Sequence, residues 1–111
     1  MTGSELYDIW TRYMHRSDLS ADLDEVFRGA EQLIQTRLMF PATQDDLDDI
    51  LANWGSLYVH AGLIRLHELA QNDEGMMRES GMFGPLIDDY QFYRSMRDND
   101  TIAMGAAVYA T

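Results

Sequence analysis

Apolar residues recur at three- and four-residue spacing along most of this sequence, and that spacing is the period of an α-helix. In the first half it predicts a helix over residues 4–16, capped by Ser4, and a longer helix over residues 20–39 after a turn-like stretch. Pro41 ends the second helix, because a proline disfavours helical geometry in the residue before it. No alternating strand pattern occurs outside the last eleven residues.

The second half follows the same period with more interruptions. Thr43 can cap a short acidic segment over residues 44–53, and Ser56 can cap the apolar stretch that follows it. Whether these form one bent helix or two is left open. Glycine and methionine interrupt residues 75–84, and Pro85 suits the first position of a last helix that ends near residue 97.

These elements predict an all-α fold. A chain of 111 residues is long enough for one domain and too short for two that each bury a core. We expect a small helical bundle of about four helices over residues 1–100, followed by an extended C-terminal arm over residues 101–111.

Charge and composition exclude several classes of function. With 19 acidic and 8 basic side chains the net charge is -11, which repels nucleic acid phosphate and argues against sequence-specific DNA binding. The absence of cysteine excludes disulfides, thiolate metal sites and a catalytic thiol. No apolar run approaches the roughly 20 residues that cross a bilayer, and residues 1–5 do not resemble a signal peptide. We therefore expect a protein that stays in the cytoplasm where it is made, away from membranes.

The polar side chains show no catalytic or metal-binding pattern. His60 and His67 are seven residues apart, which is too far for two ligands of one metal on a helix, so we interpret both as packed or exposed side chains. No phosphate-binding loop, nucleophile elbow or histidine paired with a nucleophile is visible. The sequence predicts that the protein is not an enzyme and needs no cofactor or metal.

Four carboxylates in five residues form the acidic run Asp45, Asp46, Asp48 and Asp49. It lacks the glycine and the final glutamate of a calcium loop. The run is interpreted as a solvated helix start favoured by the helix dipole, with an acidic face toward a partner or a DNA channel as the functional alternative.

Two apolar stretches remain. The methionines at residues 76, 77 and 82, beside Phe83, fill the core or form an adaptable binding surface. Residues 101–111 carry no charge, so we expect a partner to cover them, as a strand added to a neighbouring sheet, unless they are a frayed end lying on their own bundle. The candidate binding residues of this arm are Thr101, Ile102, Met104, Val108 and Tyr109.

Three stretches together resemble the head-to-tail connector, or portal adaptor, family of tailed bacteriophages. Residues 6–38, with Tyr7-Asp8-Ile9-Trp10 and Ala30-Glu31, are similar to the family's opening segment and its long helix. Residues 51–63 resemble its tyrosine-containing helix start, and Asn72-Asp73-Glu74 resembles its acidic close.

The resemblance implies a structural subunit of the virion neck at the portal vertex. It implies a homo-oligomeric ring, typically a dodecamer, that binds the portal protein on one side and tail or neck proteins on the other. DNA would pass through the channel without sequence-specific binding, and the C-terminal arms would reach into the portal. The alternative from a different class is a small acidic binding protein, such as an inhibitor that mimics DNA.

Overall fold

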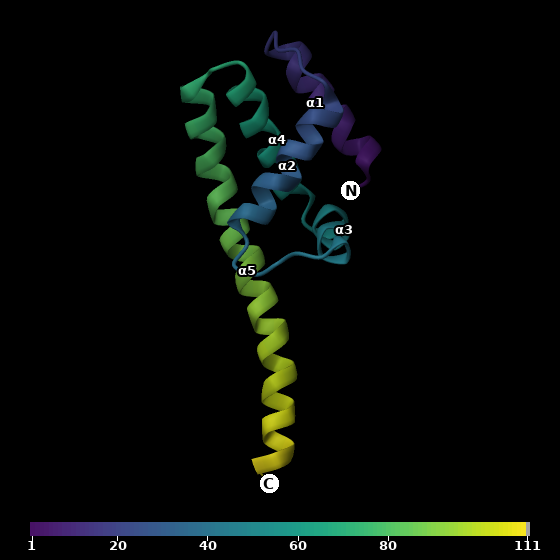
Figure 1. Cartoon of the computed structure of the whole chain (residues 1–111), viewed down its shortest axis with the longest axis vertical. Helices are drawn as coiled ribbons and strands as arrows, with labels where there is room; N and C mark the ends of the chain where they lie inside the picture. Colours follow the sequence, from purple (N-terminus) through teal and green to yellow (C-terminus); the bar gives the residue numbers. More distant parts are fainter. Residues whose placement is uncertain (111) are drawn as a thin grey trace.

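Helix α4 (Gly55–Leu69) lies at the centre of the molecule, and the other helices pack on it (Figure 1). In this computed structural model, which describes the backbone of residues 1–110 and the side chains of residues 1–97, five helices and no strands occur. The others are α1 (Gly3–Arg16), α2 (Leu23–Arg37), α3 (Gln44–Asn53) and α5 (Asp73–Ala110). The predicted all-α fold is confirmed.

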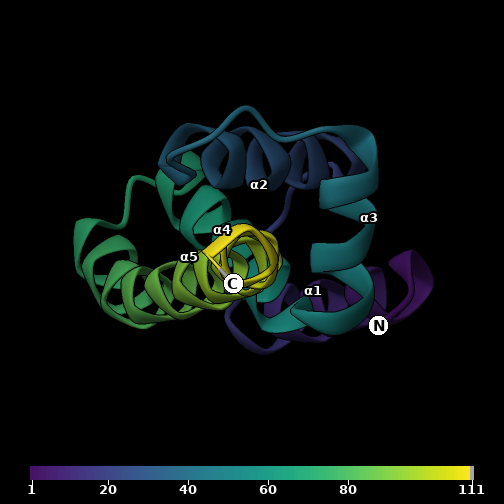
Figure 2. The ribbon, with the colours of Figure 1, turned by 90° about the horizontal axis from the view of Figure 1, so that it is seen from below.

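The central position of α4 follows from its composition. Its side chains are apolar on nearly every side, and a helix of that kind is stable only when neighbours surround it. Helices α1, α2 and α3 lie around one side of it, and α5 lies along the other (Figure 2). Leu57, Tyr58, Ala61 and Leu66 are buried there, whereas Leu69, which the spacing also places inward, is 41% exposed.

Helix ends agree in part with the predicted caps. Thr43 caps α3 as expected, through a capping box with Asp46. Helix α1 is capped by Thr2 rather than Ser4, and α2 by Asp22. Helices α3 and α4 are separate, because the backbone breaks at Trp54, and no side chain caps α4 there.

Helix α5 differs most from the prediction. It begins at Asp73 and runs without interruption through the glycine-rich stretch, so Pro85 lies inside the helix rather than at its first position. Proline removes the hydrogen bond to the carbonyl four residues earlier, here that of Gly81, and its ring crowds that carbonyl. Phe83, Ile87 and Tyr90 bury their side chains on either side of this defect, and that packing keeps the helix continuous.

Helix α5 extends beyond the bundle (Figure 1). Its 38 residues give a length of about 57 Å. The molecule measures 63 Å along its longest axis, and its radius of gyration is 16.6 Å, against about 13 Å for a compact chain of this length. The boundary predicted at residue 100 falls inside α5, so the arm begins as a helical continuation of the bundle.

Two helices end in the same kind of turn. At the end of α4, Gln71 has a positive φ of 55°, the Gln71 amide donates to the carbonyl of Glu68, and the Asn72 amide donates to that of His67. This is a Schellman motif, in which glycine is the usual residue at the positive φ. Asp18, with φ 54°, occupies the corresponding position after α1.

Replacing Gln71 by glycine should therefore stabilise the protein. The left-handed conformation costs a side-chain-bearing residue about 1 kcal/mol, and glycine removes that cost. We expect Gln71→Gly to raise the free energy of unfolding in urea by about 1 kcal/mol. A decrease in the free energy of unfolding would show that the Gln71 side chain makes a contact that offsets the cost of its left-handed conformation.

Helix α1 approaches α4 closely at one glycine. A Cβ on Gly62 would lie 2.2 Å from ring atoms of Trp10, whose indole is fully buried and donates to the carbonyl of Val59 at 3.2 Å. The position therefore accepts no larger residue unless α1 moves.

We expect Gly62→Ala to lower the free energy of unfolding by about 3 kcal/mol, because the new methyl group overlaps the Trp10 ring. Gly81→Ala is the matched control, since nothing lies within 4 Å of the new Cβ. In a helix interior that change should stabilise by about 1 kcal/mol. Equal effects of the two substitutions in chemical denaturation would contradict the close approach.

Candidate interaction surface

The part of α5 that leaves the bundle has one covered side and one uncovered side. Tyr90 is fully buried against Trp54, with ring centroids 5.5 Å apart. The uncovered side carries Phe92 and Met96, which are 69% and 48% exposed; at its edge lies Tyr93, which is 45% exposed and whose ring also contacts Trp54 at a centroid distance of 5.6 Å. Residues three or four apart in a helix are neighbours, so these three form one surface, termed here the α5 apolar surface.

The periodic pattern did not separate these two sides. Ile87, Tyr90, Tyr93 and Met96 all repeat at helical spacing in the sequence, but only Ile87 and Tyr90 are buried. The methionine-rich stretch divides similarly, because Phe83 is buried while Met77 and Met82 are mainly exposed. This stretch therefore contributes side chains both to the core and to the exposed surface of α5.

An ion pair anchors α5 to α3 within the segment that carries these exposed side chains. Arg94 Nη1 donates to Asp46 Oδ1 at 2.6 Å, and the Arg94 guanidinium lies 4.4 Å from the centre of the Phe40 ring. Burial acts to raise the pKa of Asp46, but hydrogen bonds from Thr43 and Arg94 outweigh it and hold the pKa below its ordinary value. Gln91 adds a contact by accepting from the Met39 amide at 2.7 Å.

The four carboxylates of the predicted acidic face therefore differ in their surroundings. Asp46 is a structural residue that caps α3 and binds α5. Asp45 and Asp48 are exposed on α3, with Asp48 accepting from Gln44, and Asp49 is half-buried and accepts from Asn53. Sequence reasoning missed the Asp46–Arg94 pair because the two residues are far apart in the chain.

The Asp46–Arg94 ion pair makes the free energy of unfolding depend on pH in the acidic range. Because the pKa of Asp46 is lowered from 3.8 in the folded protein, its ionised form contributes stability that is complete above about pH 3.8 and is lost as the pH falls below that value. We expect Asp46→Asn to destabilise the protein at neutral pH by about 2 kcal/mol.

In urea titrations at about pH 7 and about pH 3, the Asn variant should lose less stability on acidification than the wild type. Asp45→Asn is the matched control, since its exposed side chain lies one residue away. If Asp45→Asn reduced the acid sensitivity as much as Asp46→Asn, the anchor would not be its source.

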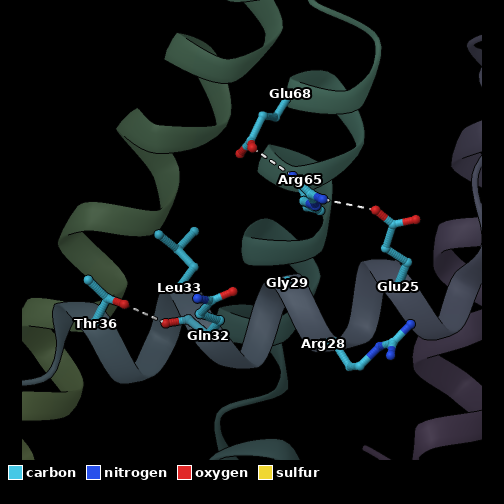
Figure 3. Close-up of a pocket in the computed structure, with 8 residues that line it drawn as sticks. All are labelled: Glu25, Arg28, Gly29, Gln32, Leu33, Thr36, Arg65 and Glu68. Atoms are coloured by element: carbon cyan, nitrogen blue, oxygen red, sulfur yellow. Dashed lines mark hydrogen bonds and ion pairs between the residues drawn. The ribbon is translucent and has the colours of Figure 1, made fainter.

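A shallow pocket of about 410 Å³ lies between α2 and α4 (Figure 3). At its centre Arg65 donates to Glu25 at 2.9 Å and to Glu68 at 2.6 Å. The stem of Arg65 crosses Gly29, where a Cβ would lie 2.8 Å from its Cγ. The lining residues are Glu25, Arg28, Gly29, Gln32, Leu33, Thr36, Arg65 and Glu68. Two positive and two negative side chains balance, so the pocket offers no net charge to a small ion.

The two histidines have separate partners. His67 is 3% exposed, and its Nε2 lies 2.6 Å from the Tyr13 hydroxyl. His60 Nδ1 lies 2.8 Å from a carboxylate oxygen of Glu79. Among the side chains of residues 1–97, no group of three or more histidines and carboxylates is placed to hold a metal ion.

The five candidate arm residues, Thr101, Ile102, Met104, Val108 and Tyr109, lie in the backbone of α5, and their side chains fall outside the described residues. The strand expected for the arm differs from the helical backbone seen there. In the described part of the chain, no helix has the length and apolar character needed to span a bilayer.

No protein-family model, curated protein or solved structure matches this chain. The functional argument therefore depends on α5 and on the residues that anchor it.

Proposed function

We propose that this chain is a non-catalytic subunit of a larger assembly and that α5 is its docking element. The observation that carries the proposal is an uncovered apolar side, Phe92, Tyr93 and Met96, on a helix that continues into the uncharged residues 101–110. Exposed aromatic and methionine side chains of this kind are enriched where proteins contact partners. Their attachment to a well-anchored helix limits the entropy that binding would cost.

The particular assembly we propose is the head-to-tail connector of a tailed phage. The resemblance of residues 6–74 to that family supports it, and an all-α bundle with a projecting C-terminal helix is compatible with it. In this proposal the subunits form a ring in the virion neck, α5 and the arm contact the portal protein, and the opposite end contacts tail or neck proteins. The net charge of -11 suits a channel that DNA passes without adhering.

The alternative of an acidic DNA mimic has less support. A mimic needs free carboxylates at phosphate-like spacing, but Asp46 is paired with Arg94, and Glu25 and Glu68 are paired with Arg65. These pairs remove three carboxylates from any display of negative charge. The arrangement therefore favours an assembly subunit over a mimic.

The proposal predicts that α5 is required for docking. We expect deletion of residues 101–111, or the double substitution of Phe92 and Met96 by serine, to reduce co-sedimentation with assembled portal at least tenfold. The double substitution removes apolar contact area without touching the core, because both side chains are exposed. Light scattering should also detect a ring, either of the purified chain or of the chain bound to portal.

Met77→Ser is the matched control, since Met77 is 76% exposed on α5 but lies near the other end of the helix. It should leave binding unchanged. Full co-sedimentation of both the deletion and the double variant would overturn the docking role of α5.

A further inference from the structure

Asn72, in the turn between α4 and α5, makes four hydrogen bonds, one of which is the ordinary helical bond from the Met76 amide to its carbonyl at 3.0 Å. Its backbone amide donates to the carbonyl of His67 at 2.8 Å, which closes α4. Its side-chain Oδ1 accepts from the amide of Gly75 at 3.1 Å, and this bond caps the first turn of α5. Its side-chain Nδ2 lies 3.2 Å from Nδ1 of His67. The cap of α5 and the imidazole of His67 therefore share one amide group.

This sharing determines the protonation state of His67. The Gly75 amide can only donate, so the oxygen of the Asn72 side chain faces it and the NH2 group faces His67. Nδ1 of His67 must then accept a hydrogen bond, which requires a neutral ring with its proton on Nε2. That proton is donated to the Tyr13 hydroxyl at 2.6 Å, which also accepts from Arg78 at 3.4 Å.

The surroundings of His67 oppose both movement and charge. A Cβ on Gly75 would lie 2.3 Å from Nδ1 of His67, so the start of α5 lies directly against the ring. The charged groups around it are Arg78 and Glu79 from α5, and Arg16 from α1, whose guanidinium lies over the Tyr13 ring. From α4, His60 binds Glu79 and so engages the nearest carboxylate. Burial, and then Arg78, lower the pKa of His67, while Glu79 acts in the opposite direction.

We propose that His67 couples acidification to the capping of α5. A proton added to Nδ1 points at the NH2 group of Asn72, and the two donors repel. Turning the Asn72 amide by half a rotation presents its oxygen to the protonated ring but takes that oxygen away from Gly75. The first turn of α5 then loses its cap, and its contact with α1 and α4 loosens. The structure thereby assigns a pH-responsive role to the α4–α5 turn.

The direction of the effect follows from linkage. Because the pKa of His67 in the folded protein lies below its ordinary value of 6.5, the closed arrangement binds the proton less well than the open one. The stability supplied by neutral His67 is complete above pH 6.5 and is lost as the pH falls from 6.5 through the lower folded pKa.

The test is an NMR titration of the full chain labelled with ¹⁵N-glycine and ¹⁵N-histidine, from about pH 7.5 to about pH 5. We expect the Gly75 amide signal to move in step with protonation of His67. After correction for the intrinsic effect of pH, its hydrogen exchange should become about fivefold faster, which is the loss of one typical cap. The amide of Gly84, on the same helix and away from His67, is an internal reference.

Asn72→Asp is the matched variant. One carboxylate oxygen can accept from Gly75 while the other accepts from protonated Nδ1, so the cap should survive acidification and His67 should protonate at higher pH. His15 and His60 are unchanged in this variant, so their titration cannot account for a difference. Constant Gly75 exchange while His67 protonates, no protonation of His67 down to about pH 5, or an equal response of the two proteins would each overturn the proposal.

Discussion

The hydrogen bonds of Asn72 determine how α5 leaves α4, and the position of every later residue depends on that turn. The backbone amide ends one helix, the side-chain oxygen begins the next, and the side-chain nitrogen holds His67 against both. Gly75 permits the approach, because any Cβ there would occupy the space of the imidazole. Helix α5 therefore packs on the central α4 from its first turn, and its far end leaves the bundle in a direction set at its start.

Much of the fold could be predicted because its signals are local. The cap at Thr43 and the helical spacing of the apolar residues depend only on neighbours in the chain. Residues 75–85 show where local rules fail. Their glycines and proline favour an interruption, yet Phe83 and Ile87 are buried in the shared core, and burial outweighs the lost hydrogen bond of Pro85.

The candidate surface was predictable only in part, for a related reason. The lack of charge in residues 101–111 drew attention to the end of the chain at which α5 projects from the bundle (Figure 1). The helical spacing of apolar residues in α5, however, continues through Tyr93 and Met96, so periodicity alone does not distinguish these exposed side chains from the buried Ile87 and Tyr90. Which side chains of α5 are covered depends on contacts with distant parts of the chain, such as the packing of Trp54 on Tyr90 and the Asp46–Arg94 pair.

The continuity of α5 also has a mechanical meaning. Helix α5 is packed on the bundle from Asp73 to Arg94, so its lever arm is the roughly 24 Å of backbone that continues to Ala110, where a tilt of about 10° displaces the end by about 4 Å. A small change in packing near Arg94 is therefore enlarged at the far end of α5. The Asp46–Arg94 pair, a little over halfway along α5, supports the base of this arm and restrains its movement. One uninterrupted helix in this way connects the turn at Asn72 with the exposed side chains of Phe92 and Met96.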